Sequence, residues 1–258
     1  MRASLLSVLA LTLLACDAAD APRAVNPYDP DVHGPGYDAC EIQYASGVVA
    51  QRSFDHDGRL SHVHYLGAYV APDEWYGYAE GHTTRIEIFD RRNQSVAAWT
   101  YDRDDQGGLA LVTHFVSGAR NDAQRWHLDT DGAPLKVDYD QGADGTFEPG
   151  HGEIFERDQY GCPSLHATRT ADGASRERIH ARTDDCAPIW IEQDFGADGT
   201  IDRVDEYVYD EADPTRLVAT TSQGVTTQAY DYDELGRLIR IGYASGPPDV
   251  LRYDCAGM

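Results

Sequence analysis

The stretch YDYDELGRLIRIGY at residues 230–243 decides the fold of the chain. Tyrosine and aspartate alternate over residues 230–233, which is the two-residue period of a β-strand. Gly236 marks a tight turn, because glycine adopts the positive φ angles that such turns require. Residues 237–243 alternate again. The stretch therefore predicts two antiparallel strands joined by a short turn.

The same pattern recurs along the 258 residues: an aromatic or apolar residue, an acid, a short polar turn that usually holds glycine, and an alternating strand. The recurrences begin at Phe54-Asp55, Phe89-Asp90, Tyr101-Asp102, Leu128-Asp129, Phe155-Glu156, Tyr209-Asp210 and Tyr232-Asp233. Regular steps of this kind indicate one hairpin per unit. The best helical candidates, residues 73–80 and 119–124, are short. We expect an all-β fold: an antiparallel meander of consecutive β-hairpins forming a long twisted or curled sheet.

Three segments carry a resemblance to a known repeat: YDELGRL at 232–238, FDHDGRL at 54–60 and, more loosely, YDEADPTRL at 209–217. They resemble the YD repeat of the Rhs-type family, whose large members wind such hairpins into a shell around a toxic or signalling domain. The resemblance implies a sheet of consecutive hairpins. Because this chain holds too few units for a closed shell, we expect an open sheet with protected edge strands and no role in toxin delivery.

The N-terminal residues MRASLLSVLALTLLAC combine a basic Arg2 with an apolar run at 5–14 that is too short to span a bilayer as a stable helix. The ending Leu13-Leu14-Ala15-Cys16 resembles the lipobox of bacterial lipoproteins, which implies cleavage before Cys16 and lipidation of its thiol and new amino group. The alternative is an ordinary signal peptide with a chance cysteine.

These features divide the chain into a signal peptide at 1–15, a lipidated proline-rich tether at 16–39 and a single domain at 40–258 with a first strand at 41–49. We expect the domain outside the cytoplasm, in a bacterial cell envelope. The outer membrane is favoured over the inner one, although Asp17 beside the lipidation site leaves the choice open.

Acidic residues outnumber basic ones 44 to 21, so the formal net charge is −23. Such a surface repels nucleic acid and anionic lipid head groups, which excludes a nucleic-acid partner. The charge fits solubility, cation binding or a basic partner equally well.

Besides Cys16, the expected lipidation site, the chain holds four cysteines, and an even number in an exported chain predicts two disulfides, with three possible pairings. We favour a local Cys162–Cys186 bridge and a Cys40–Cys255 clasp between the ends of the domain. Zinc binding through these cysteines is disfavoured, because the sequence holds no C-x-x-C pair.

Two acidic segments with the shared pattern D-x-G-A-D-G-T-x-[DE] stand 54 residues apart: DQGADGTFE at 140–148 and DFGADGTID at 194–202. Acids at positions one and five with glycine at six resemble the start of a calcium loop. Positions three and twelve depart from that pattern, and the alternative is a bare hairpin turn. The calcium ligands would be Asp140, Asp144, Glu148, Asp194, Asp198 and Asp202.

Two further groups are candidate sites. His62 and His64 share one face of a strand and, with a carboxylate, could hold a transition metal; the alternative is a polar strand face. Trp75, Tyr76 and Tyr78, in what we expect to be an irregular loop at 72–82, could form a stacking platform for a sugar or peptide. Their alternative role is ordinary strand packing.

No catalytic motif for nucleophilic, zinc-hydrolytic or phosphate chemistry is present. We therefore expect a non-enzymatic cell-envelope lipoprotein, a binding or structural module. It would contact the membrane through Cys16, its candidate partners are an envelope protein or a glycan, and calcium is the one cofactor candidate; no nucleotide is expected. One alternative is a calcium-dependent glycan- or protein-binding module. The other is a hydrolase with an acidic carboxylate site.

Overall fold

The computed structural model describes residues 29–31, 33, 36–67, 73–142, 144–171, 173–181 and 186–253, which form eighteen β-strands. No described segment forms a helix able to span a membrane. The strands are β1 (Glu41–Gln43), β2 (Val49–Phe54), β3 (Leu60–Leu66), β4 (Asp73–Ala79), β5 (His82–Phe89), β6 (Ser95–Arg103), β7 (Leu109–Val116), β8 (Ala119–Leu128), β9 (Pro134–Asp140), β10 (Gly152–Arg157), β11 (Pro163–Thr170), β12 (Gly173–Ala181), β13 (Pro188–Phe195), β14 (Arg203–Tyr209), β15 (Leu217–Ser222), β16 (Val225–Tyr232), β17 (Leu238–Tyr243) and β18 (Asp249–Arg252).

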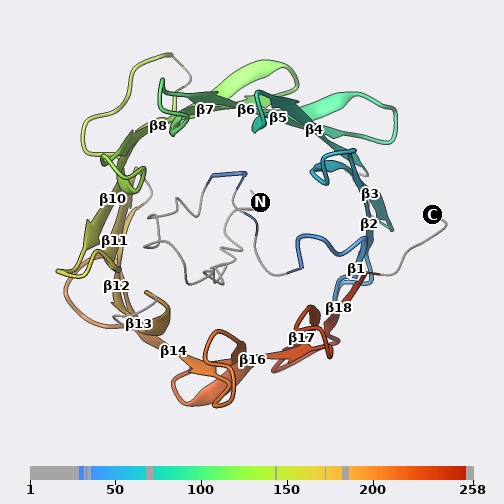
Figure 1. The fold of residues 1–258 in the computed structure, drawn as a ribbon. Coiled ribbons are helices and arrows are strands. Elements are labelled where there is room, and N and C mark those ends of the chain that lie inside the picture. Colours follow the sequence, from blue (N-terminus) through green and yellow to red (C-terminus); the bar gives the residue numbers. More distant parts are fainter. Residues whose placement is uncertain are drawn as a thin grey trace.

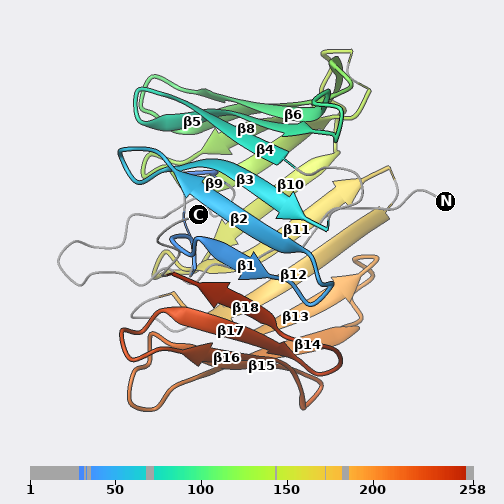
Figure 2. The same cartoon turned by 90° about the vertical axis from the view of Figure 1, so that its right-hand side faces the viewer.

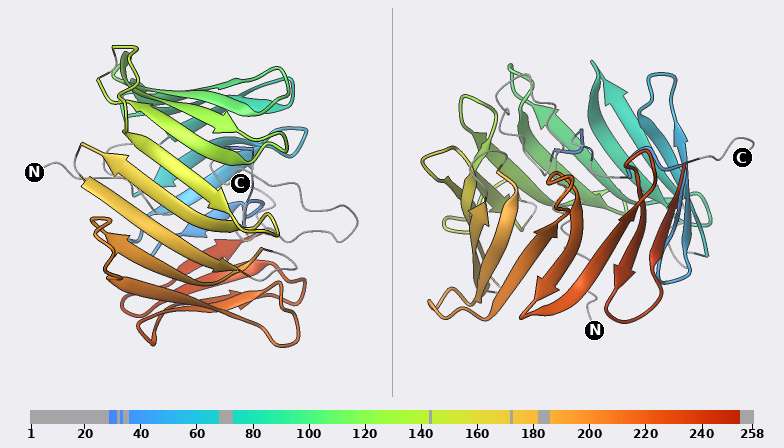
Figure 3. Two further views of the ribbon diagram at one scale, coloured as in Figure 1. Left: turned by 90° about the vertical axis from the view of Figure 1, so that its left-hand side faces the viewer. Right: turned by 60° about the horizontal axis from the view of Figure 1, so that its bottom comes forward.

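Each strand pairs antiparallel with its neighbours in sequence, and β1 pairs with both β2 and β18. At the seam Glu41 lies opposite Arg252, and Gln43 lies opposite Val250. The sheet therefore closes into a barrel, seen end-on in Figure 1. Its strands are inclined to one another around the wall, as Figures 2 and 3 show.

The expected open, Rhs-like sheet is wrong, because the β1–β18 pairing leaves no free edge. Eighteen twisted strands suffice to return the sheet to its start, without the many units of a large shell. The two segments considered for helices, residues 73–80 and 119–124, lie mainly on strands β4 and β8. The expected strand at 41–49 is instead two strands, β1 and β2, joined by a turn.

The recurring acid caps a turn. In six turns an aspartate side chain accepts the backbone N–H groups of the residues two and four positions further on, within 2.8–3.0 Å. The fourth residue of each turn has a positive φ angle, as at Gly236 (79°). These turns begin at Asp55, Asp90, Asp104, Asp129, Asp158 and Asp233. In two units the acid that caps the turn is not the one the sequence pattern predicts. Asp104 replaces Asp102, and Asp158 replaces Glu156, because Asp102 and Glu156 lie within strands β6 and β10.

The arginine and leucine of the G-R-L motif link consecutive hairpins. The Arg237 guanidinium lies 4.5 Å from the centre of the Tyr253 ring, and the Tyr253 hydroxyl donates to the Leu238 carbonyl at 2.6 Å. Two other sets repeat this arrangement: Arg59, Leu60 and Tyr78, and Arg216, Leu217 and Tyr232. The motif thus encodes both a turn and its attachment to the next hairpin.

The N-terminal residues identify the inner wall. Arg52 donates to the carbonyls of Gly36 and Tyr37, and Arg103 binds Asp29, while this N-terminal segment lies within the ring in Figure 1. Part of the expected tether is therefore attached to the barrel. Side chains alternate between the two faces of a strand, so the residues that share a face with Arg103, such as Tyr101, also point inward. Three apolar clusters line this wall, centred on Trp126, Leu251 and Leu60.

Candidate functional site on the outer wall

Two histidines and an aspartate meet on the outer wall, where β3 pairs with β4. One Asp73 oxygen, Oδ1, lies 2.9 Å from His62 Nε2 and 2.9 Å from His64 Nδ1. Within the described part of the chain, this is one of two groups whose three ligand-type atoms lie within 4.8 Å of one another. The arrangement offers two imidazole nitrogens and one carboxylate oxygen at a single point.

Strand register produces this meeting. His62 lies opposite Trp75, and His64 lies opposite Asp73. Between the histidines, Val63 is buried and paired with the inward-facing Arg52, so both imidazoles point outward. The sequence supplied the histidine pair but not its partner, because residues 73–79 were not expected to form the neighbouring strand.

The aspartate is held in its charged form. Burial alone would raise the pKa of Asp73, but hydrogen bonds from His64 and His62 outweigh that effect and lower the pKa below its usual value. The His62 ring stacks on Trp75, with centroids 4.1 Å apart, which fixes one imidazole in place.

The second group, Asp55, His56 and Asp57, belongs to a turn. Asp55 accepts two backbone N–H groups and also binds Arg59, whose Nε lies 2.9 Å away. The His56 side chain is 87% exposed. This group is therefore engaged in turn formation and makes a poorer site than the histidine pair on β3.

The three aromatic residues of the expected platform do not share one face. Trp75 is half exposed on the outer wall. Tyr76 faces inward, where its hydroxyl donates to Glu74, and Tyr78 donates to the Leu60 carbonyl. The region expected to be a loop is mostly strands β4 and β5, joined by the turn at Glu80-Gly81, and Pro72 lies outside the described residues.

The two acidic segments form turns in which backbone N–H groups bind the carboxylates, although buried Asp140 Oδ1 has no hydrogen-bond partner among the described residues. In the first, buried Asp140 accepts the Gly145 N–H at 3.0 Å and binds Arg120 at 2.6 Å. In the second, Asp194 accepts the N–H groups of Asp198 and Gly199. The remaining predicted ligands, Asp144, Glu148, Asp198 and Asp202, also accept backbone N–H groups. Calcium binding here stays a prediction.

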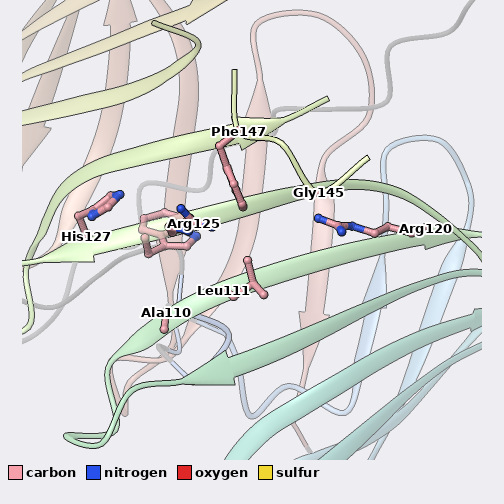
Figure 4. A pocket seen from close by; sticks show the side chains of 8 residues that line it. Ala110, Leu111, Arg120, Arg125, His127, Gly145 and Phe147 are labelled. Atoms are coloured by element: carbon pink, nitrogen blue, oxygen red, sulfur yellow. The ribbon is translucent and has the colours of Figure 1, made fainter. Parts of the chain in front are cut away.

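A shallow basic pocket of about 540 Å³ lies beside the first acidic segment, over strands β7 and β8 (Figure 4). Arg125 stacks over the Phe147 ring at 3.8 Å from its centre. His127 lies at the end of the pocket opposite Arg120, and its Nε2 is 2.7 Å from Asp138. Sequence reasoning missed this pocket, because its residues come from three separate segments and form no motif.

The Cys162–Cys186 disulfide is present, as predicted, with Cα atoms 5.0 Å apart. Cys40 is disulfide-bonded as well. Its predicted partner Cys255 and the predicted lipidation site Cys16 both lie outside the described residues.

No protein-family model and no curated protein matches the chain. Among solved structures, a porin-like protein from Bacteroides uniformis is 9% identical with a TM-score of 0.46, covering 84% of this chain and 98% of that one. A porin-like protein from Bacteroides vulgatus is 11% identical with a TM-score of 0.30, covering 84% and 99%. A TcdB2-TccC3-Cdc42 structure is 10% identical with a TM-score of 0.41; the match covers 78% of this chain and only 12% of that one. Similarities this low carry no inference about function.

Proposed function

We propose that the chain is an exported cell-envelope protein, anchored through lipid on Cys16, whose barrel stands in water as a non-enzymatic binding scaffold. The lipobox-like ending of residues 1–16 supports the anchor. The Cys162–Cys186 disulfide supports an oxidising compartment outside the cytoplasm.

The charged outer wall is the observation that carries the proposal. A barrel that crosses a bilayer presents an outward apolar band to lipid, and a charge at mid-depth costs about 2–4 kcal/mol. Here outward-facing strand residues form ion pairs around the wall: Arg85–Glu87, Lys136–Asp138, Arg178–Glu192, Arg240–Asp231 and Arg252–Glu41. This wall suits contact with water, so the membrane attachment is assigned to the N-terminal lipid.

A binding role, and not catalysis, is proposed because one histidine–carboxylate group on each wall is bonded within itself. On the inner wall, His166 lies between Glu153 and Glu177, and on the outer wall Asp73 lies between two histidines. A rigid wall with residues held in this way presents fixed contact points to a partner.

The test is membrane fractionation of cells that produce the full chain, compared with Cys16→Ser. We expect the wild-type chain in the membrane fraction after an alkaline wash, carrying acyl groups by mass spectrometry. The Cys16→Ser chain should be exported without acyl groups and leave the membrane in that wash.

Asp17→Asn is the matched control, because it changes the neighbouring residue and keeps the cysteine; it should remain acylated and membrane-bound. Retention in alkaline-washed membranes of Cys16→Ser chains that mass spectrometry shows to lack residues 1–15 would place the barrel itself in the bilayer and overturn the proposal.

A further inference from the structure

We propose that His62, His64 and Asp73 form a binding site for one divalent transition-metal ion of the zinc class on the outer wall of the barrel. The inference rests on side chains of β3 and β4 and does not depend on the lipid anchor.

The spacing of the three ligand atoms suits such an ion. Asp73 Oδ1 lies 2.9 Å from each histidine nitrogen, and the three atoms lie within 4.8 Å of one another. Ligands at about 2.0–2.2 Å from a tetrahedral ion are separated by roughly 3.3–3.5 Å. An ion can therefore replace the bridging protons if the nitrogens move apart from the oxygen by about 0.5 Å, which small side-chain rotations supply.

The donor set selects the kind of ion. Two imidazoles with one carboxylate suit zinc, copper or nickel, whereas calcium and magnesium prefer sites made wholly of oxygen. The Asp73 carboxylate adds a negatively charged oxygen ligand to the two nitrogen ligands, which favours a divalent cation.

The site is both pre-positioned and accessible. Cross-strand pairing places His64 opposite Asp73, and the stack on Trp75 holds the His62 ring. The His64 side chain is 41% exposed, so an ion can enter from solvent. Three protein ligands leave a fourth position for water or for an anionic group of a partner.

The other described pairings of histidine with acid lack this donor set. Asp138 is contacted by only one described histidine, His127, and its second contact is with Lys136, which is not a second imidazole ligand. The His166 imidazole is enclosed between two carboxylates on the inner wall. His127 is therefore a suitable control, because it lies on the same outer wall and its side chain contacts an aspartate of the neighbouring strand β9.

The experiment is a calorimetric titration of the purified full chain, first stripped with EDTA, with zinc chloride alone. We expect one ion per chain for wild type and His127→Gln. His64→Gln and Asp73→Asn each remove a ligand and should weaken binding by at least the roughly 10–100-fold that loss of a mere supporting partner costs. Circular dichroism checks that each variant is folded.

A second readout needs no variant: zinc should shift the imidazole resonances of two histidines in the wild-type chain, and cobalt should give the visible absorption of a nitrogen- and oxygen-coordinated ion. The proposal is overturned if the wild-type chain binds no zinc, or if folded His64→Gln and Asp73→Asn bind it as tightly as His127→Gln does.

Discussion

His166 illustrates how a single side chain can tie the inner wall together. Its Nε2 lies 2.7 Å from Glu153 and its Nδ1 lies 3.3 Å from Glu177, while the Tyr139 hydroxyl also donates to Glu153. Burial alone would lower the pKa of His166, but hydrogen bonds from the imidazole to Glu153 and Glu177 outweigh it and raise the pKa to about 9.

The raised pKa predicts a pH dependence of stability. A charged His166 stabilises the folded state, so its contribution is complete below the ordinary pKa of 6.5 and is lost as pH rises through about 9. The shift corresponds to about 3 kcal/mol. Urea unfolding at pH 6.5, 8 and 9.5 should show the wild-type chain losing stability over that window and His166→Gln losing less. Equal losses in both chains would contradict the assignment, and His127→Gln serves as the control.

At the scale of elements, the β9–β10 pairing depends on a glycine. Gly152 begins β10 with a φ angle of 145°, and a Cβ atom there would lie 1.9 Å from the Val137 carbonyl oxygen of β9. Gly173 begins β12 with a similar φ angle of 153°, but a Cβ atom there would meet no atom of the described residues within 4 Å. The two positions therefore share a backbone conformation and differ in the space available to a side chain.

We predict that Gly152→Ala destabilises the barrel by about 1–3 kcal/mol more than Gly173→Ala does, because only the former forces a backbone shift. Thermal unfolding of both variants measures the difference. Equal melting temperatures would contradict the prediction, because they would show that the close approach of β9 to Gly152 does not affect the stability of the barrel.

The acidic turns give a second prediction at this scale. Because backbone N–H groups and Arg120 already bind Asp140 Oδ2 and both carboxylate oxygens of Asp194, we expect millimolar calcium to leave the melting temperature of the EDTA-treated chain unchanged. An ion at 100 times its dissociation constant would add about 2.7 kcal/mol. A rise of several degrees that is absent with magnesium and lost in Asp198→Asn would instead establish a calcium loop.

These elements also show what the sequence could reveal. The hairpin at 230–243 is β16 and β17 with the turn at Asp233, because alternation and turn chemistry are local properties. The pattern predicts Asp102 as the acid of its turn, whereas Asp104 is the residue that caps it, because both aspartates fit the pattern. Asp73 was missed as a partner of His62 and His64, because cross-strand register depends on where both strands begin.

Over the whole molecule, an N-terminal segment is fixed to the inner wall. Arg103 binds Asp29 and Asp31 at 2.5–2.6 Å, and Asp31 also accepts the Thr83 N–H at 2.8 Å. All three charged side chains are less than a quarter exposed. This contact joins residues about 70 positions apart in the sequence.

We predict that Arg103→Ala frees this segment, at a cost of about 1.5–3 kcal/mol for each hydrogen bond to a charged group that is left unmade. Limited proteolysis should then cut near residues 29–40 faster than in wild type, and the Thr83 amide should exchange faster. Arg85→Ala, which removes an exposed outer-wall pair with Glu87, is the control. Unchanged proteolysis in Arg103→Ala would show that other contacts hold the segment.

Closure of the barrel was beyond sequence reasoning, because no local pattern links β1 to β18 across more than 200 residues. The chain has fewer repeat units than the large shells of the Rhs-type family, and this comparison predicted an open sheet. The pairing of Glu41 with Arg252 instead closes the barrel. Local chemistry thus specifies each hairpin, and the accumulated twist decides whether the last strand meets the first.

The β1–β18 seam makes the order of strands cyclic, although the chain itself is linear. Every strand has two antiparallel neighbours. Strands β1 and β18 are therefore paired as any two consecutive strands are, although no turn joins residue 253 to residue 40. A circular permutant could therefore join those ends through a short linker and open the chain at the exposed Gln223-Gly224 turn instead. Such a permutant would keep all eighteen pairings while carrying its new termini to a different part of the rim.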